Sequence, residues 1–197
     1  MGKFLTRDAI VGGVPGSRTE GGGSVRPLAG CDLATFGAGP AWSVEPAFRH
    51  HPGVLETTVG YAGGNLANPT YLDVFCEQSG HAEAVQVRYD RNRTSYNDLL
   101  EIFWSCHDPT QLNRQGADIG IQYRSVIFCH NGAQTMLARH SRDLKERGRA
   151  FLRPIVTQIE LLQHFWRAEN ALQRPPGLKD SKTAVPVPKF SKPRSGA

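Results

Sequence analysis

A six-residue alternation of apolar and polar side chains constrains the fold of this chain more than any other feature. Residues 84–89 read Ala-Val-Gln-Val-Arg-Tyr, which places Val85, Val87 and Tyr89 on one face of a predicted strand. An amphipathic helix follows, because Ser95 is a suitable cap for a segment with an apolar stripe. That stripe consists of Leu99, Leu100, Phe103 and Trp104. A half-buried strand followed by a half-buried helix predicts a sheet that is covered by helices.

Strands and helices continue to mix through residues 33–174, which we expect to form one domain. Further strands are predicted at 33–36, 55–61, 122–128 and 154–159, and a further helix at 133–147. A short helix is also expected to begin near Ser43 or Val44, because Pro46 then falls in its first turn, where a missing N–H is harmless. These elements indicate the α+β class. We expect a two-layer α/β sandwich with a ferredoxin-like split β-α-β core.

Both ends of the chain differ in composition from this domain. Residues 1–30 hold eight of the 21 glycines, so residues 1–32 are predicted to be a flexible Gly-rich leader. Residues 175–197 hold five prolines, and five Lys/Arg against one acidic residue. We therefore predict a basic Pro-rich tail there.

Charge, hydropathy and cysteine spacing exclude several kinds of partner. The net charge is +5, but residues 33–174 carry 14 basic and 14 acidic residues, so we expect no nucleic-acid partner. No apolar run reaches the roughly 18 residues of a membrane helix, and the N-terminal apolar stretch is too short for a secretory signal. The four cysteines form no CxxC pair, so we expect a cytoplasmic protein with reduced thiols. Adjacent Cys-His pairs at 106–107 and 129–130 cannot chelate one ion, and we predict no metal site.

Short sequence blocks follow one another in order along residues 33–173. They are Gly-Ala-Gly-Pro-Ala-Trp at 37–42, Val-Gly-Tyr-Ala-Gly-Gly at 59–64, Asn-Pro-Thr-Tyr at 68–71, Gly-His-Ala-Glu at 80–83, His-Asp-Pro-Thr at 107–110, Gln-Tyr-Arg-Ser at 122–125 and Phe-Trp-Arg-Ala-Glu at 165–169. In these blocks the chain resembles the peptide-methionine (S)-S-oxide reductases, the A-type methionine sulfoxide reductase family. The resemblance covers nearly the whole predicted domain.

The resemblance implies an activity and a set of partners. The activity is the thiol-dependent reduction of methionine-S-sulfoxide, in peptides or as the free amino acid, which repairs proteins after oxidative stress. The partners are oxidised peptides or proteins that bear methionine sulfoxide. No cofactor is expected to be bound, thioredoxin or a dithiol is the implied reductant, and we expect a monomer.

The resemblance also assigns roles to individual side chains. Glu83 is the implied acid, and Tyr71 and Tyr123 are implied to donate hydrogen bonds to the same sulfoxide oxygen. Asp118 belongs to the implied hydrogen-bond network near the nucleophile, and Trp42 is the implied wall of the methyl pocket. A carboxyl group buried among aromatic side chains has a raised pKa, as a general acid near neutral pH requires.

The nucleophile of that family is missing. Pro40 stands where the resemblance requires the nucleophilic cysteine, and Ala41 stands where the family has phenylalanine. Near the C-terminus, Ala171 and Leu172 replace the family's Tyr-His pair. Because proline has no nucleophilic atom, we expect the chain to be inactive or very weak by the standard mechanism.

Two alternative functions stay open. The side chains of the oxygen and methyl pockets could bind methionine sulfoxide or methionine without turnover, as a non-catalytic binding module. Alternatively, the chain is a reductase that uses another cysteine. Cys76 is the best candidate, because it lies between Tyr71 and Glu83, one position beyond where many members of the resembled family carry a cysteine. Cys31 lies too far along an extended chain from the nucleophile position, and Cys106 and Cys129 are expected to pack as small apolar residues.

Overall fold

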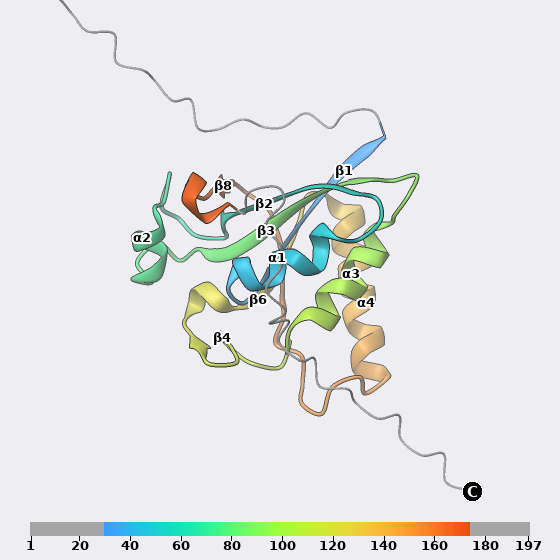
Figure 1. The fold of residues 1–197 in the computed structure, drawn as a ribbon. Coiled ribbons are helices and arrows are strands. Elements are labelled where there is room, and N and C mark those ends of the chain that lie inside the picture. Colours follow the sequence, from blue (N-terminus) through green and yellow to red (C-terminus); the bar gives the residue numbers. More distant parts are fainter. Residues whose placement is uncertain (1–29, 174–197) are drawn as a thin grey trace, which may run out of the picture.

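A six-stranded mixed sheet of order β7-β6-β1-β3-β2-β8 organises residues 30–173, the part of the chain that this computed structural model describes (Figure 1). The strands are β1 (Cys31–Ala38), β2 (Val54–Ala62), β3 (Ala82–Asp90), β6 (Ser125–Cys129), β7 (Gln158–Leu161) and β8 (Phe165–Arg167), and β4 (Arg114–Gln115) and β5 (Asp118–Ile119) form a separate hairpin. The predicted tail and residues 1–29 of the predicted leader lie outside the described residues. The α+β class is confirmed.

The helices follow the strands in a simple order. They are α1 (Ala41–Arg49), α2 (Tyr71–Phe75), α3 (Tyr96–Cys106), α4 (Gly132–Arg147) and the 3₁₀ helices η1 (Ile121–Tyr123) and η2 (Asn170–Leu172). Helix α1 connects β1 to β2, and β3 lies between these two strands and antiparallel to both. Helix α3 connects β3 to the region before β6, which is antiparallel to β1. Strand β7 then adds in parallel to β6, and β8 adds antiparallel to β2.

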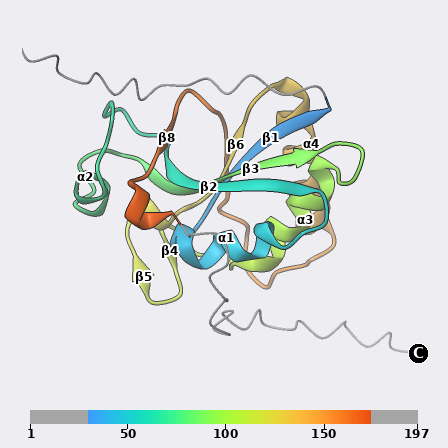
Figure 2. The same cartoon turned by 45° about the horizontal axis from the view of Figure 1, so that its top comes forward.

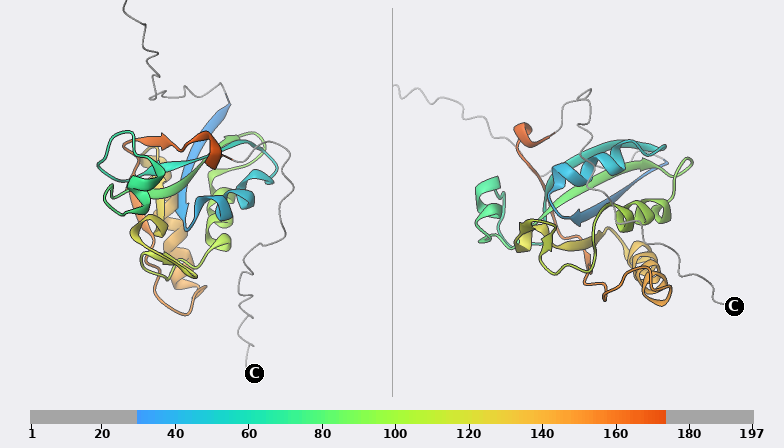
Figure 3. Two further views of the ribbon diagram at one scale, coloured as in Figure 1. Left: turned by 60° about the vertical axis from the view of Figure 1, so that its left-hand side comes forward. Right: turned by 60° about the horizontal axis from the view of Figure 1, so that its bottom comes forward.

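Helices α1 and α3 cover one face of the sheet (Figure 3), and aromatic stacking holds them there. Phe36 of β1 stacks on Phe48 of α1 with ring centroids 5.0 Å apart, and on Phe103 of α3 at 5.4 Å. On the opposite face, a smaller apolar cluster around Phe128 is covered by Leu162 and Phe165. Burial of these large side chains supplies most of the stabilisation of such a domain. Within residues 30–173, no helix combines the length and the apolar character needed to cross a membrane.

A buried histidine joins the end of α3 to the sheet. His107 donates from Nδ1 to the carbonyl oxygen of Phe103 at 2.8 Å, and its Nε2 lies 2.7 Å from the hydroxyl of Ser125. The Ser125 hydroxyl lies 2.7 Å from that of Thr157. Burial lowers the pKa of His107 to about 4, against the smaller opposing influences of the Phe103 carbonyl and of Asp108. The ring is therefore neutral at physiological pH.

Helices and strands with a clear sequence pattern were predicted, whereas short elements were not. The Ser95 cap is confirmed: its hydroxyl accepts from the N–H of Asp98, whose carboxylate accepts from the N–H of Ser95. The predicted strand 122–128 begins only at Ser125, because residues 121–123 form η1. The predicted strand 154–159 begins only at Gln158. Helix α2, the β4–β5 hairpin and β8 were not predicted, because each is too short to show a period.

The predicted start of the first helix was wrong. Helix α1 begins at Ala41 with Pro40 as its N-cap, so Pro46 lies inside the helix. The Pro40 carbonyl accepts hydrogen bonds from the N–H groups of Ser43 at 3.0 Å and Val44 at 3.3 Å, and from the Ser43 hydroxyl at 2.8 Å. These bonds close the first turn two residues earlier than the position of Pro46 alone suggests.

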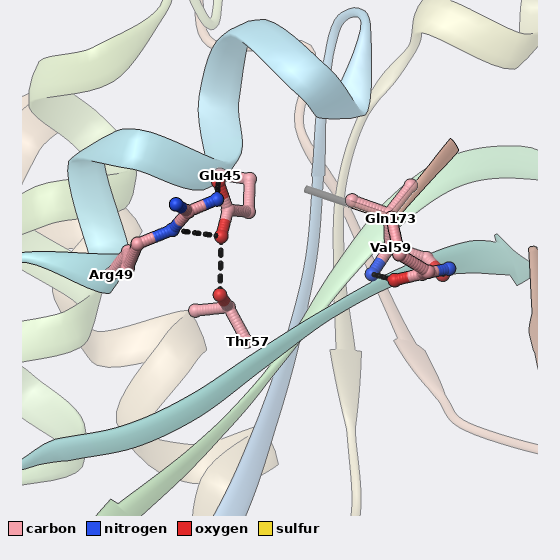
Figure 4. A network of polar contacts seen from close by, with 5 residues as sticks. All are labelled: Glu45, Arg49, Thr57, Val59 and Gln173. Atoms are coloured by element: carbon pink, nitrogen blue, oxygen red, sulfur yellow. Dashed lines mark hydrogen bonds and ion pairs between the residues drawn. The ribbon is translucent and has the colours of Figure 1, made fainter. Parts of the chain in front are cut away.

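A buried carboxylate holds α1 in place around its internal proline (Figure 4). Glu45 accepts two hydrogen bonds from Arg49, both of 2.7 Å, and another from the hydroxyl of Thr57 on β2. Glu45 is 3% exposed, so these bonds form largely out of contact with water. They tie α1 to β2 through side chains, which offsets the backbone hydrogen bond that Pro46 cannot donate to residue 42.

Pro46→Ala is expected to raise the free energy of unfolding by about 1–2 kcal/mol, as measured by urea denaturation. Alanine restores the missing N–H donor, and the loss of proline's rigidity in the unfolded chain cancels part of the gain. Pro52→Ala is the matched control, because Pro52 lies in the turn after α1 and should bring no gain. A lower stability for Pro46→Ala would show that the helix needs the proline.

Candidate functional site

The polypeptide turns sharply between β1 and α1. Gly39 has φ +102°, a conformation that favours glycine, and a Cβ there would lie 2.7 Å from the side chain of Gln115. Pro40 follows with φ −57° and ψ 120°, and it is buried. The turn therefore brings the first backbone N–H groups of α1 to the end of the sheet where β3 begins.

The carboxyl group of Glu83 meets this helix start. Glu83 is the second residue of β3, is 8% exposed, and accepts a hydrogen bond on Oε2 from the N–H of Ala41 at 2.9 Å. Burial raises the pKa of Glu83; the Ala41 bond opposes this, and the negative charge of Asp118 adds to it. A protonated carboxyl group at this place can donate a hydrogen bond to a ligand.

The negative charge of Glu83 acts on two tyrosines, Tyr123 and Tyr61. Tyr123 belongs to η1, and its pKa is raised first by partial burial and then by Glu83 and Tyr71. Tyr71 is the exposed first residue of α2. Tyr61, which lies opposite Glu83 in the pairing of β2 with β3, also has a raised pKa, caused by burial, then by Glu169, and to a smaller extent by Glu83 and Tyr71. The hydroxyl groups of Tyr123 and Tyr61 therefore stay protonated.

Asp118 and Trp42 complete the residues suggested by the sequence. Asp118 lies exposed on β5, and its charge raises the pKa of both Glu83 and Tyr123. Trp42 lies in the first turn of α1, and its side chain is 61% exposed. Figures 1 and 2 show the start of α1, α2 and the β4–β5 hairpin at the same end of the sheet. The fold thus places a carboxyl group, phenol groups and an exposed indole around one helix start.

Comparison with known proteins decides the family. Residues 32–175 match the family model described as peptide methionine sulfoxide reductase. The chain belongs to this family. It is 53% identical to the peptide methionine sulfoxide reductase MsrA of Methanoculleus marisnigri over 148 residues, which are 75% of this chain and 90% of that protein.

Solved structures of the family have the same fold. The methionine sulfoxide reductase A of Corynebacterium diphtheriae is 31% identical, with a TM-score of 0.68 over 82% of this chain and 85% of that one. Mxr1 of Saccharomyces cerevisiae in complex with Trx2 is 25% identical, with a TM-score of 0.53 over 77% of this chain and 92% of that one.

None of the four cysteines, all of which lie within residues 30–173, belongs to the start of α1. Cys76 is exposed and caps the C-terminal end of α2. Cys31 begins the eight-residue strand β1, which puts it about 23 Å from the end of that strand. Burial raises the pKa of Cys106 to about 12 and raises that of Cys129 as well, so both thiols stay protonated.

No group of three or more His, Cys, Asp or Glu side chains that could hold a metal ion occurs within residues 30–173. The histidines of the two adjacent Cys-His pairs form hydrogen bonds with other residues. His107 is held by Phe103 and Ser125, and His130 lies 2.9 Å from the hydroxyl of Thr35.

Two residues that support the site were not assigned a role from the sequence. His81 accepts on Nδ1 from the N–H of Gly64 at 3.0 Å and donates from Nε2 to the carbonyl of Leu66 at 2.8 Å, so it holds the loop after β2. Glu169 accepts from the N–H of Tyr71 at 2.8 Å. Both lie inside recognised sequence blocks, but nothing in the sequence named their partners.

Proposed function

We propose that this protein binds methionine-S-sulfoxide side chains of oxidised peptides and does not reduce them by the thiol-dependent route of its family. The observation that carries the proposal is the contact of the Glu83 carboxyl group with the N–H of Ala41, directly after Pro40. An acid and a helix start meet there, and the residue at the helix start has no thiol.

The missing step is the formation of a bond to sulfur. Reduction requires a thiolate that attacks the sulfoxide sulfur while the oxygen is protonated and leaves, which yields methionine and a sulfenic acid on the enzyme. A cysteine at the N-cap of α1 would be well placed, because the N-terminal end of a helix stabilises a thiolate. Pro40 fits the same backbone position but offers no electron pair for this attack.

The binding half of the chemistry remains available. A protonated Glu83 and the hydroxyl groups of Tyr71 and Tyr123 are three donors for one sulfoxide oxygen. The exposed indole of Trp42 provides an apolar surface for the S-methyl group. A sulfoxide oxygen is a strong acceptor, and methionine lacks it, so this donor set supports selectivity for the oxidised side chain.

The missing thiol at residue 40 also removes the need for a reductant. By resemblance, thioredoxin or another dithiol would reduce the oxidised enzyme, and the relative Mxr1 was solved in complex with Trx2. Because Pro40 cannot form a sulfenic acid or a disulfide, we propose that this chain engages oxidised peptides without consuming a dithiol.

Cys76 supports a second candidate function, a reductase with a displaced nucleophile. It is the exposed cysteine, and it lies on the same short helix as Tyr71. Mass spectrometry after exposure to a sulfoxide peptide should find no sulfenic adduct or disulfide on Cys76. Dithiothreitol-dependent turnover that is lost in Cys76→Ser would instead establish this second function.

Binding of an acetylated methionine-S-sulfoxide peptide should strengthen as the pH falls through the raised pKa of Glu83. The protonated acid donates to the sulfoxide oxygen, whereas the carboxylate repels it. Glu83→Gln should remove this pH dependence, because an amide donates at every pH, and Glu83→Ala should weaken binding about tenfold. Calorimetric titrations at several pH values measure both effects.

The unoxidised methionine peptide is the control ligand for this titration. It should bind weakly and without the pH dependence that Glu83 confers. Failure of the sulfoxide peptide to bind the wild-type chain, or an unchanged pH dependence in Glu83→Gln, would contradict the proposed function.

A further inference from the structure

The last described residues form a strap across the edge of the sheet. We call residues 165–173 the strap; it contains β8 and η2. Strand β8 pairs with residues 60–62 of β2, and the N–H of Ala168 donates to the carbonyl of Val59 at 3.0 Å. Figures 1 and 2 show η2 between β2 and α2. The strap therefore lies beside the candidate site.

The side chain of Gln173 fixes the far end of the strap (Figure 4). Its Oε1 accepts from the N–H of Val59 at 2.9 Å, and its Nε2 donates to the carbonyl of Val59 at 2.7 Å and to that of Ala168 at 2.9 Å. The amide thus pairs with β2 as a strand residue would. Glu169 lies between this anchor and β8, so its backbone is held on both sides.

The carboxylate of Glu169 joins two elements of the site. Its Oε2 accepts from the hydroxyl of the buried Tyr61 at 3.0 Å, and its Oε1 accepts from the backbone N–H of Tyr71 at 2.8 Å. Partial burial acts to raise the pKa of Glu169, but hydrogen bonds from the N–H of Tyr71, from its own N–H and from Tyr61 lower it overall. The group is therefore ionised at neutral pH and is a strong acceptor.

Helix α2 needs such an anchor. It has only five residues, and helices this short are not stable alone. Thr70 and Asp73 cap its first turn, but both belong to the same segment and do not tie it to the sheet. Beyond its C-terminal end, Glu77 accepts from the N–H of Ile121 at 3.3 Å. Glu169 is thus the hydrogen-bonded link from the sheet edge to the residue that carries the phenol.

We propose that Glu169 is a positioning residue of the candidate site: by holding the N–H of Tyr71, it fixes where the Tyr71 hydroxyl meets a sulfoxide oxygen. The inference rests on the proposed function. It assigns the strap a role in selecting the oxidised side chain as well as in completing the sheet.

A double-mutant cycle tests this role, with binding of the acetylated methionine-S-sulfoxide peptide and of the methionine peptide as readouts. Glu169→Ala and Tyr71→Phe should each weaken sulfoxide binding about five- to tenfold and leave methionine binding unchanged. The double variant should bind like Tyr71→Phe alone, because Glu169 acts through the Tyr71 hydroxyl. Glu169→Gln, which keeps an acceptor oxygen, should bind nearly as the wild type does.

Controls separate this role from a merely structural one. Arg167→Ala changes the same strap at an exposed side chain that bonds to Asn170, and it should bind normally. If Glu169→Ala does not fold, Glu169→Asp replaces it: aspartate keeps the charge but is too short to reach both donors, and should weaken sulfoxide binding in the same way.

Each outcome decides between the two proposals. Additive losses in the double variant, or equal losses for both peptides, would overturn the positioning role while the proposed function stands. Absence of sulfoxide binding by the wild-type chain would overturn the proposed function, and the positioning role with it.

Discussion

Pro40→Cys is expected to raise methionine-S-sulfoxide reductase activity by at least about 10³-fold over the wild-type chain, measured with dithiothreitol as reductant. Cysteine can adopt the φ of −57° and ψ of 120° that Pro40 has at the N-cap of α1. There the helix end favours the thiolate, and the acid Glu83 already bonds to the next N–H. The substitution supplies the electron pair that the site lacks.

Two control variants and one alternative outcome show which residues determine the activity of Pro40→Cys. Pro40→Ser should stay inactive, because a hydroxyl group does not form a sulfenic acid. Pro40→Cys combined with Cys76→Ser should keep the activity if residue 40 alone is the nucleophile. A silent Pro40→Cys variant that still binds the sulfoxide peptide would implicate Ala41, or Ala171 and Leu172, as further losses.

Acidification from pH 6.5 to pH 4 is expected to lower the free energy of unfolding by about 3 kcal/mol through His107 alone. The pKa of His107 is about 4 in the folded chain and about 6.5 when unfolded, so between these values the unfolded state binds a proton that the folded state does not. Stability is complete above pH 6.5 and falls as the pH approaches 4. Urea denaturation at several pH values measures this loss.

His107→Gln provides the reference for that measurement. It removes the titrating ring, so it should lower stability at pH 7 but flatten the dependence on pH between 6.5 and 4. The half-buried His130, whose pKa is lowered by desolvation, contributes to the slope in both proteins and cancels in the difference. An identical slope in the two proteins would show that His107 is not the group responsible.

Periodic segments of the fold could be predicted from the sequence, whereas its short elements could not. The alternation in β3 and the stripe of α3 are long enough for their period to identify them. The start of α1 was mispredicted because the position of Pro46 alone favours a later start. The Glu45 contacts that hold the helix around Pro46 come from tertiary structure. Helix α2 has five residues and depends on contacts with distant segments.

For the candidate site, the sequence suggested side chains but not the contacts between them. Sequence blocks suggested Glu83, Tyr71 and Tyr123, and the fold brings their segments to one end of the sheet. The bond between Glu169 and Tyr71 joins residues 98 positions apart, and no local pattern encodes it. The raised pKa of Glu83 was expected from burial, but the hydrogen bond that it accepts from the Ala41 N–H is seen only in the folded structure.

The pairing of Gln173 with Val59 sets a practical limit on shortened versions of this chain. The Gln173 amide accepts from the N–H of Val59, which would otherwise be a free backbone donor at this strand edge, whereas the Val59 carbonyl also accepts from the N–H of Ala168. A fragment that stops at residue 172 would keep every helix and strand of residues 30–172 and still leave the N–H of Val59 open to other molecules. Within residues 30–173, the edge of β2 is thus completed by a side chain that follows the last described helix.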